Sequence, residues 1–209
     1  MSGASQRRRR EEGSEAPSKR ALATRTALLS AAQEIFVRYG YEAATIAAIV
    51  ERSGTSTGSL YNQFGGKPGL FFALRSELSE RLWTVTAEAI DSRRAAGDQD
   101  PLSIYLAGAR AYLMACWDER AVAAVLLSGD APHGVEAIRH AQLHRWIGQN
   151  AAVLQVHDRL FGEELAAAVT AVVAAAVPQI LTRESRRDAA ALTDYFAELI
   201  TRLMRPGAP

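Results

Sequence analysis

Residues 45–67 read TIAAIVERSGTSTGSLYNQFGGK, and this stretch decides the fold. It holds two short segments with an apolar stripe, separated by a four-residue turn that contains Gly54. Thr45 precedes the first segment and Ser56 precedes the second, and both residue types cap helix N-termini. Two short helices joined by a turn in which glycine takes the left-handed conformation are typical of a helix-turn-helix. The alternative is an ordinary helical corner with capping hydroxyl groups.

The second predicted helix, residues 57–63, has an apolar side and a polar side. Leu60 and Phe64 lie four residues apart, so we expect them to point into the core of a three-helix unit. The small residues that follow the cap, and would allow close approach to the major groove, are Thr57, Gly58 and Ser59. The outward side chains that can donate hydrogen bonds are Tyr61, Asn62, Gln63 and Lys67. This side of the helix therefore suits a nucleic-acid surface.

Helical periodicity extends over almost all of the chain after residue 22. The predicted helices cover residues 21–39, 46–52, 57–63, 67–94, 101–117, 119–128, 134–157, 161–181 and 185–204. No segment has the alternating pattern of a strand. We therefore expect an all-α protein of about nine helices. Its predicted parts are a disordered basic arm (1–22), a helix-turn-helix domain (23–67) and a helical domain for effector binding and dimerisation (68–209).

The charge of the chain is unevenly distributed. The net charge is only +1, but residues 1–25 hold seven basic and three acidic residues, while the remainder holds 17 basic and 20 acidic ones. Arg7, Arg8, Arg9 and Arg10 form one run. A basic arm on a slightly acidic body suits a polyanion, because neutralising phosphates releases counterions. A solvated tail that binds nothing is the alternative.

The stretch from Thr26 to Leu70 resembles the N-terminal domain of the TetR family. The matching positions are Ala31, Ala32, Phe36, Gly40, Tyr41, Thr45, Ile49, Gly54, Ser56, Gly58, Tyr61, Phe64, Lys67 and Leu70. The resemblance implies phosphate contacts by Thr45, Tyr61 and Lys67. It also implies that Thr57, Gly58, Ser59 and Asn62 face bases. Gln63 stands where the family often has a phosphate-binding histidine, and Pro68-Gly69 replaces the usual acidic start of the next helix.

The last two predicted helices carry clear apolar stripes. Two such helices meeting a symmetry mate form a four-helix bundle, and the resemblance also implies a dimer interface here. The predicted interface residues are Val169, Val172, Val173, Ala176, Tyr195, Phe196, Leu199 and Ile200. Packing of these stripes within a single chain is the alternative.

The resemblance also implies a ligand cavity among the middle helices. Aromatic side chains with a polar edge suit a drug-like or aromatic ligand. The candidate lining residues are Phe72, Trp83, Tyr105, Tyr112, Cys116, Trp117, His144, Trp146 and Ile147. Each of them also fits an ordinary core position.

Other classes of protein are disfavoured by what the sequence lacks. The apolar runs are short and Ala-rich, so we expect no membrane span, which needs roughly 18 apolar residues. Cys116 is the only cysteine, which favours a cytoplasmic protein without an intrachain disulfide. His140 and His144 have a spacing that could bind metal, but no third ligand follows them, so we expect neither metal nor cofactor. No nucleophilic or acid–base motif indicates an enzyme.

These features together predict a ligand-responsive transcriptional regulator, with a repressor favoured. It would bind palindromic double-stranded operator DNA as a homodimer and be released by an unidentified small-molecule effector. The alternative function is that of a helical small-molecule-binding or adaptor protein without specific DNA binding.

Overall fold

The computed structural model describes residues 19–156 and 160–205, and within these ranges every regular element is a helix. The predicted all-α class is confirmed. The N-terminal part consists of three helices, α1 (Lys19–Ala43), α2 (Ile46–Ser53) and α3 (Thr57–Phe64).

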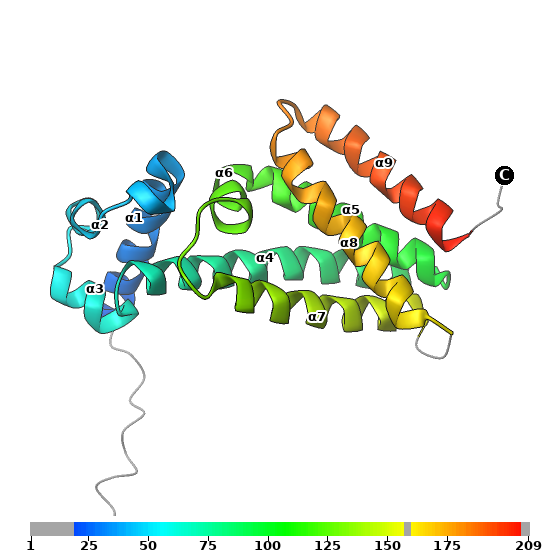
Figure 1. Ribbon diagram of the computed structural model, residues 1–209, viewed down its shortest axis with the longest axis horizontal. Helices are drawn as coiled ribbons and strands as arrows, with labels where there is room; N and C mark the ends of the chain where they lie inside the picture. Colours follow the sequence, from blue (N-terminus) through cyan, green and yellow to red (C-terminus); the bar gives the residue numbers. More distant parts are fainter. Residues whose placement is uncertain (1–18, 157–159, 206–209) are drawn as a thin grey trace, which may run out of the picture.

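The larger C-terminal part is a bundle of longer helices. It consists of α4 (Lys67–Ala95), α5 (Pro101–Asp118), α6 (Arg120–Ala123), the π-helical turn η1 (Ala124–Ser128), α7 (Val135–Leu154), α8 (Gly162–Leu181) and α9 (Arg186–Met204). Helix α4 begins beside α3 and extends along the whole bundle, with α7 next to it (Figure 1). Helix α5 contacts α4, α7, α8 and α9, so it lies at the centre of the bundle.

The caps predicted for the helix-turn-helix are confirmed. The Thr45 hydroxyl accepts a hydrogen bond from the Ala48 N–H at 3.2 Å, and the Ser56 hydroxyl accepts one from the Ser59 N–H at 3.2 Å. Gly54 ends α2 with a φ of 64°, a left-handed conformation that costs glycine little. The local chemistry of the sequence thus places both short helices correctly.

Three segments differ from the sequence-based expectation. Residues 19–22, predicted as part of a disordered arm, form the first turn of α1, while the rest of that arm (1–18) lies outside the described residues. Helix α1 continues past its predicted end to Ala43, with a kink at Gly40, where φ is 77°. The helix predicted over 119–128 divides into α6 and η1, because the backbone changes to π-helical hydrogen bonding.

Aromatic side chains join the two parts of the molecule in one core. Phe36 and Tyr41 of α1 pack against Phe71 of α4, with ring centroids 6.3 and 5.0 Å from that of Phe71. A second apolar cluster, which includes Leu154 and Val169, fills the distal end of the bundle between α5, α7, α8 and α9. The first core crosses the predicted boundary at residue 67, so the division into domains there stays a prediction.

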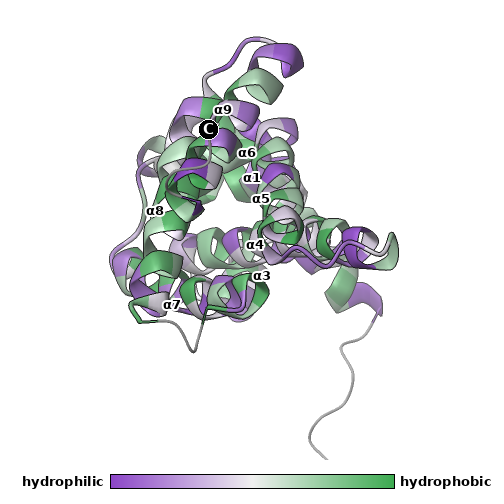
Figure 2. Ribbon diagram, turned by 90° about the vertical axis from the view of Figure 1, so that its right-hand side faces the viewer, coloured by the Kyte–Doolittle hydropathy of each residue, from purple (hydrophilic) through white to green (hydrophobic). Residues whose placement is uncertain are grey.

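Helix α8 is largely hydrophobic in Figure 2. Among the described residues it is the one helix that is long and apolar enough to cross a membrane, with a mean hydropathy of 1.8 over its best 18-residue window. The short, Ala-rich apolar runs of the sequence predict no membrane span. Core helices can have the same length and composition, and α8 contacts α5, α7 and α9. Only 33% of that window is buried, so one side of α8 is an exposed apolar face.

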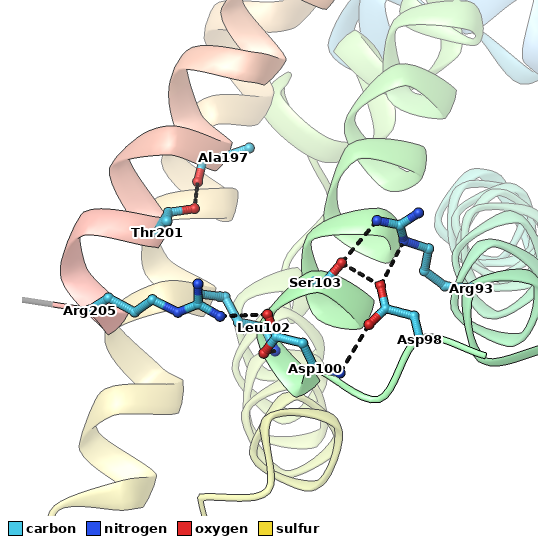
Figure 3. Close-up of polar contacts among 8 residues, drawn as sticks. All are labelled: Arg93, Asp98, Asp100, Leu102, Ser103, Ala197, Thr201 and Arg205. Atoms are coloured by element: carbon cyan, nitrogen blue, oxygen red, sulfur yellow. Dashed lines mark hydrogen bonds and ion pairs between the residues drawn. The ribbon is translucent and has the colours of Figure 1, made fainter. Parts of the chain in front are cut away.

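Two aspartates fix the turn between α4 and α5 (Figure 3). Asp98 accepts hydrogen bonds from the Ser103 hydroxyl at 2.6 Å and from the Asp100 N–H at 3.0 Å, and it pairs with Arg93. Asp100 caps α5 and also pairs with Arg205 just beyond α9. These contacts attach the α4–α5 turn to the end of the last helix.

The Asp98 contacts make stability depend on pH. The hydrogen bond from Ser103, followed by that from the Asp100 N–H, lowers the pKa of Asp98. A lowered folded-state pKa contributes stability above the unfolded pKa of about 3.9, and this contribution is lost as pH falls through the folded value. We expect Asp98→Asn to lower the melting temperature at pH 7 but to have little effect at pH 2–3. Asp91→Asn, which affects an exposed carboxylate, is the control. An equal loss at both pH values would contradict this account.

Candidate nucleic-acid interface and ligand cavity

Helix α3 is fixed against the N-terminal core by its apolar side. Leu60 is fully buried, and the guanidinium of Arg25 on α1 lies 4.8 Å from the centre of the Phe64 ring. The cap from Ser56 leaves the N–H groups of Thr57 and Gly58 at the exposed start of the helix. This end carries the positive pole of the helix dipole, which favours an anionic group.

The opposite side of α3 is open to solvent. Thr57, Gly58, Tyr61 and Asn62 are exposed, and 53% of Tyr61 is accessible. Their spacing of i, i+1, i+4 and i+5 places them on one face of the helix. Helix α3 contains no acidic residue. The face thus combines small residues at the N-terminal end with a phenol and an amide one turn later.

The other candidate DNA-contacting residues of the two short helices have local partners. The hydroxyls of Thr45 and Ser56 act as helix caps, so each accepts a backbone hydrogen bond. Ser59 is half-buried, and its hydroxyl lies 2.9 Å from that of Ser56. The Gln63 amide is turned toward α1, where Nε2 donates to the Ala21 carbonyl at 3.5 Å.

Lys67 does not point outward as the sequence analysis expected. Its Nζ donates to the carbonyl oxygens of Tyr41, Glu42 and Ala44 at 2.8, 3.1 and 3.0 Å. The ammonium also lies 4.4 Å from the centre of the Tyr41 ring. All three ammonium hydrogens are therefore used at the end of α1, where unpaired carbonyls attract a cation. In this geometry Lys67 is a structural residue, and we do not assign it a phosphate.

Gly69 explains the unusual start of α4. A Cβ placed at this residue would lie 1.7 Å from the carbonyl oxygen of Phe64, which is shorter than any non-bonded contact allows. The backbone of α4 therefore approaches the end of α3 too closely for any residue but glycine. The sequence departs from the TetR-like pattern here, and the close contact gives the physical reason.

A cavity lies between α4, α5, α7 and α8. It encloses about 610 Å³, counting its mouth to solvent, but only about 70 Å³ admits the centre of a water molecule, so it is narrow. Its aromatic walls are Trp83, Tyr105, Tyr112 and Trp146. Its polar side chains are Ser79, Thr86, Gln149, Asn150 and Thr170. The described residues that line it carry no formal charge, and burial raises the pKa of Tyr105 and Tyr112, so both phenols are neutral at pH 7.

The N-terminal segment matches a known family. Residues 28–74 fit the model of the bacterial regulatory proteins of the tetR family. The chain is also 37% identical over 65 residues to the HTH-type transcriptional repressor AcnR of Corynebacterium glutamicum, a match covering 31% of this chain and 35% of that protein. The N-terminal segment of the chain is thus a tetR-type domain.

Longer matches extend the likeness of this chain beyond the N-terminal segment. The HTH-type transcriptional regulator BetI of Burkholderia ambifaria is 27% identical over 170 residues, covering 81% of this chain and 78% of that one. A crystal structure of a TetR-like transcriptional regulator from Rhodococcus sp. RHA1 has a TM-score of 0.67 at 22% identity, and covers 87% of this chain and 95% of its own. The latter shows a shared fold. The match to AcnR spans about a third of that protein's length. The activity and partners of this chain are therefore matters for proposal.

The structure brings four of the nine candidate ligand residues to the cavity, namely Trp83, Tyr105, Tyr112 and Trp146. The other five do not line it. Phe72 and Ile147 pack against the two apolar cores, and Cys116 is buried, which raises the pKa of its thiol to about 12. The Trp117 indole donates to the Arg183 carbonyl at 3.0 Å. His144 is exposed and lies beside His140, with Nε2 atoms 3.3 Å apart.

Sequence reasoning missed the polar residues of the cavity, although one signal was available. Ser79, Trp83, Thr86 and Ile90 follow each other at the spacing of one helix face, and all four line the cavity. A helix face that mixes hydroxyls with large apolar groups is unusual for a core. Asn150 donates to Thr170 at 2.8 Å across the cavity wall, a pairing between α7 and α8 that only the fold creates.

The predicted dimer residues separate into two groups. Val169, Ala176, Phe196 and Ile200 are buried within the chain, and Val173 lines the cavity. The four buried side chains have little surface left to bury against a partner, so the prediction that they form a dimer interface is not carried into the proposal below. Val172 and Leu199 are half-buried, and Tyr195 is 60% exposed. The exposed face of α8 instead carries Ala168, Ala171 and Ala175.

The Lys67 contacts predict a stability effect. Lys67→Met removes three charge-assisted hydrogen bonds and leaves the end of α1 uncapped, so we expect a loss of about 1.5–3 kcal/mol of unfolding free energy. Urea denaturation measures it, with Lys19→Met at the exposed start of α1 as the matched control. The contrary result would be unchanged stability of Lys67→Met together with a slope of log DNA affinity against log salt concentration that is smaller by about one. That result would assign Lys67 a phosphate-binding role.

Proposed function

We propose that this chain is a cytoplasmic, ligand-responsive transcriptional repressor of the TetR family. It binds palindromic operator DNA as a homodimer and releases it when a small molecule occupies the cavity between α4, α5, α7 and α8. The observation that carries this proposal is the exposed face of α3. Thr57, Gly58, Tyr61 and Asn62 project from a capped helix start, free of the contacts that occupy their neighbours.

The chemistry of this face fits a DNA groove. Asn62 can hydrogen-bond a base edge, since asparagine recognises adenine through two hydrogen bonds. Thr57 and Gly58 are small enough for the start of α3 to approach the groove floor, where the helix N-terminus favours phosphate oxygens. Tyr61 can donate its phenol proton to a phosphate. The relatives named as transcriptional repressors share this segment of the chain.

Two copies of α3 are needed for operator specificity. One short helix contacts few bases, whereas two related by a dyad read half-sites about 34–36 Å apart. The exposed face of α8, with Ala168, Ala171 and Ala175, is small and apolar, so it lets two helices approach closely. Tyr195 and Leu203 of α9 are exposed apolar residues that extend it. We assign the dimer interface to this face of α8 and α9.

The DNA-binding role is tested on the DNA upstream of the chain's own gene. We expect a salt-dependent shift and a footprint with dyad symmetry. Asn62→Ala should cost about 1–3 kcal/mol on the operator and relax the preference at one base pair. Tyr61→Phe should weaken binding to all DNA sequences by a similar factor. Gln99→Ala, in the exposed α4–α5 turn, is the control. Absence of salt-dependent binding would favour the alternative of a ligand-binding or adaptor protein.

The dimer is tested by placing a charge on α8. Ala171→Glu introduces a carboxylate that becomes buried and unpaired if two α8 helices meet, which is strongly unfavourable. We expect a monomer in sedimentation velocity that keeps its helical circular dichroism but loses the palindromic operator. Ala141→Glu, an exposed alanine on α7, should remain dimeric. An Ala171→Glu variant that stays dimeric and binds normally would place the interface elsewhere.

A further inference from the structure

A second pocket adjoins the aromatic cavity on the side of α7. Tyr112, Trp146 and Ala174 line both, so the two spaces share a wall. The Tyr112 and Trp146 rings meet edge-on at this wall, with centroids 5.4 Å apart. The second pocket differs in charge, because Arg75 of α4 and Arg139 of α7 line it together with Gln142.

Arg75 is a buried cation without a buried counterion. It is only 6% exposed and lies on the apolar face of α4, between Phe71 and Leu78. Its Nη1 donates to the Leu126 carbonyl at 2.7 Å and its Nη2 to the Gln142 side-chain oxygen at 2.9 Å, while its Nε is buried and has no hydrogen-bond partner. Both partners are neutral. A buried guanidinium is costly unless an anion compensates it.

Arg139 adds a second positive charge to the same pocket. One of its Nη atoms pairs with Glu136 at 2.7 Å and the other donates to the Leu127 carbonyl at 3.3 Å. Its Nε, like that of Arg75, is buried without a partner. The Glu136 side chain is 79% exposed, so solvent weakens its effect on the buried Arg75. Burial and then Arg139 lower the pKa of Arg75, and the smaller opposing effects come from Tyr112 and then Glu136.

We propose that the Arg75–Arg139 pocket receives the carboxylate of the effector, whose apolar body lies against Tyr112 and Trp146. This rests on the proposed function, since it names the chemical class of the ligand for the same cavity. A planar carboxylate matches the fork of a guanidinium, and one negative charge balances the excess of two arginines over one glutamate. The neutral, aromatic walls beyond it suit an apolar ring.

The position of Arg75 also links the pocket to the N-terminal helices. Its bond to Leu126 holds η1, and η1 contacts both α1 and α4. A carboxylate competes with the Leu126 carbonyl for the same guanidinium. Occupation of the pocket therefore loosens η1 from α4 and changes its packing on α1, which carries the helix-turn-helix. π-Helical turns such as η1 are frequent at functional sites.

The test compares two probes that differ in charge. The full-length protein is titrated calorimetrically with 1-naphthoate and with 1-naphthalenemethanol, its uncharged analogue. We expect naphthoate to bind at least tenfold more tightly and to weaken operator binding. Arg139→Gln should lower naphthoate affinity by about tenfold or more and leave the affinity for the alcohol unchanged, since only the carboxylate forms charge-assisted hydrogen bonds. Arg145→Gln, which removes an exposed charge from the same helix, should change neither.

The outcomes separate this proposal from the regulator function. Arg75→Gln should act like Arg139→Gln, and thermal unfolding shows whether it folds; if it does not, Arg139→Gln decides. Equal affinity for the two probes, no naphthoate binding, or loss of both probes in Arg139→Gln would overturn the carboxylate pocket. So would stabilisation by inorganic phosphate without naphthoate binding. Operator binding measured without either probe tests the regulator function independently.

Discussion

The ammonium of Lys67 is the contact on which the rest of the arrangement depends. It stands at the first residue of α4 and holds three carbonyls at the end of α1. The chain reverses between these helices through two short helices and two glycine turns, which have few buried side chains of their own. The charge therefore sets the angle at which the helix-turn-helix joins α4. The Phe36, Tyr41 and Phe71 rings then fill the junction.

Helix α4 is consequently shared by the N-terminal helices, the arginine pocket and the aromatic cavity. Its first turn contacts α1 and α3, and Gly69 allows the backbone of α4 to touch the end of α3. About two turns later Arg75 holds η1, and farther along Ser79, Trp83 and Thr86 form a wall of the cavity. A rigid helix transmits a rotation or shift along its length. The cavity is thus connected to α3 by packed elements, through α4 itself and through η1 on α1.

The chemistry of the bundle separates into three environments. The aromatic cavity is neutral, the neighbouring pocket carries two arginines, and the outer face of α8 is apolar and small. Each environment disfavours a different kind of group. The neutral cavity disfavours ions and the arginine pocket disfavours cations. The alanine face disfavours bulky groups. The same bundle therefore presents three regions of different solvation and shape.

The sequence by itself determined the local structure. The caps at Thr45 and Ser56, the turn at Gly54 and the apolar period of the longer helices depend on neighbours within a few residues, so the pattern predicts them well. Which residues of the apolar stripes of α8 and α9 are buried within the chain, and which are exposed, could not be predicted. Val169 and Phe196 face inward while Ala171 faces solvent, because helix packing, not hydrophobicity alone, decides which side of α8 and α9 is covered.

The tertiary structure also decided the roles of the charged residues. Lys67 and Arg75 are both cations near the start of α4. Neither the residue type nor the sequence spacing shows which groups each side chain contacts. Lys67 ends at carbonyls from residues 41–44, and Arg75 ends at a carbonyl 51 residues away in sequence. Such contacts join segments that only the fold brings together. Helical caps are local and could be read from the sequence, whereas the destination of a long charged side chain depends on the packing of the whole molecule.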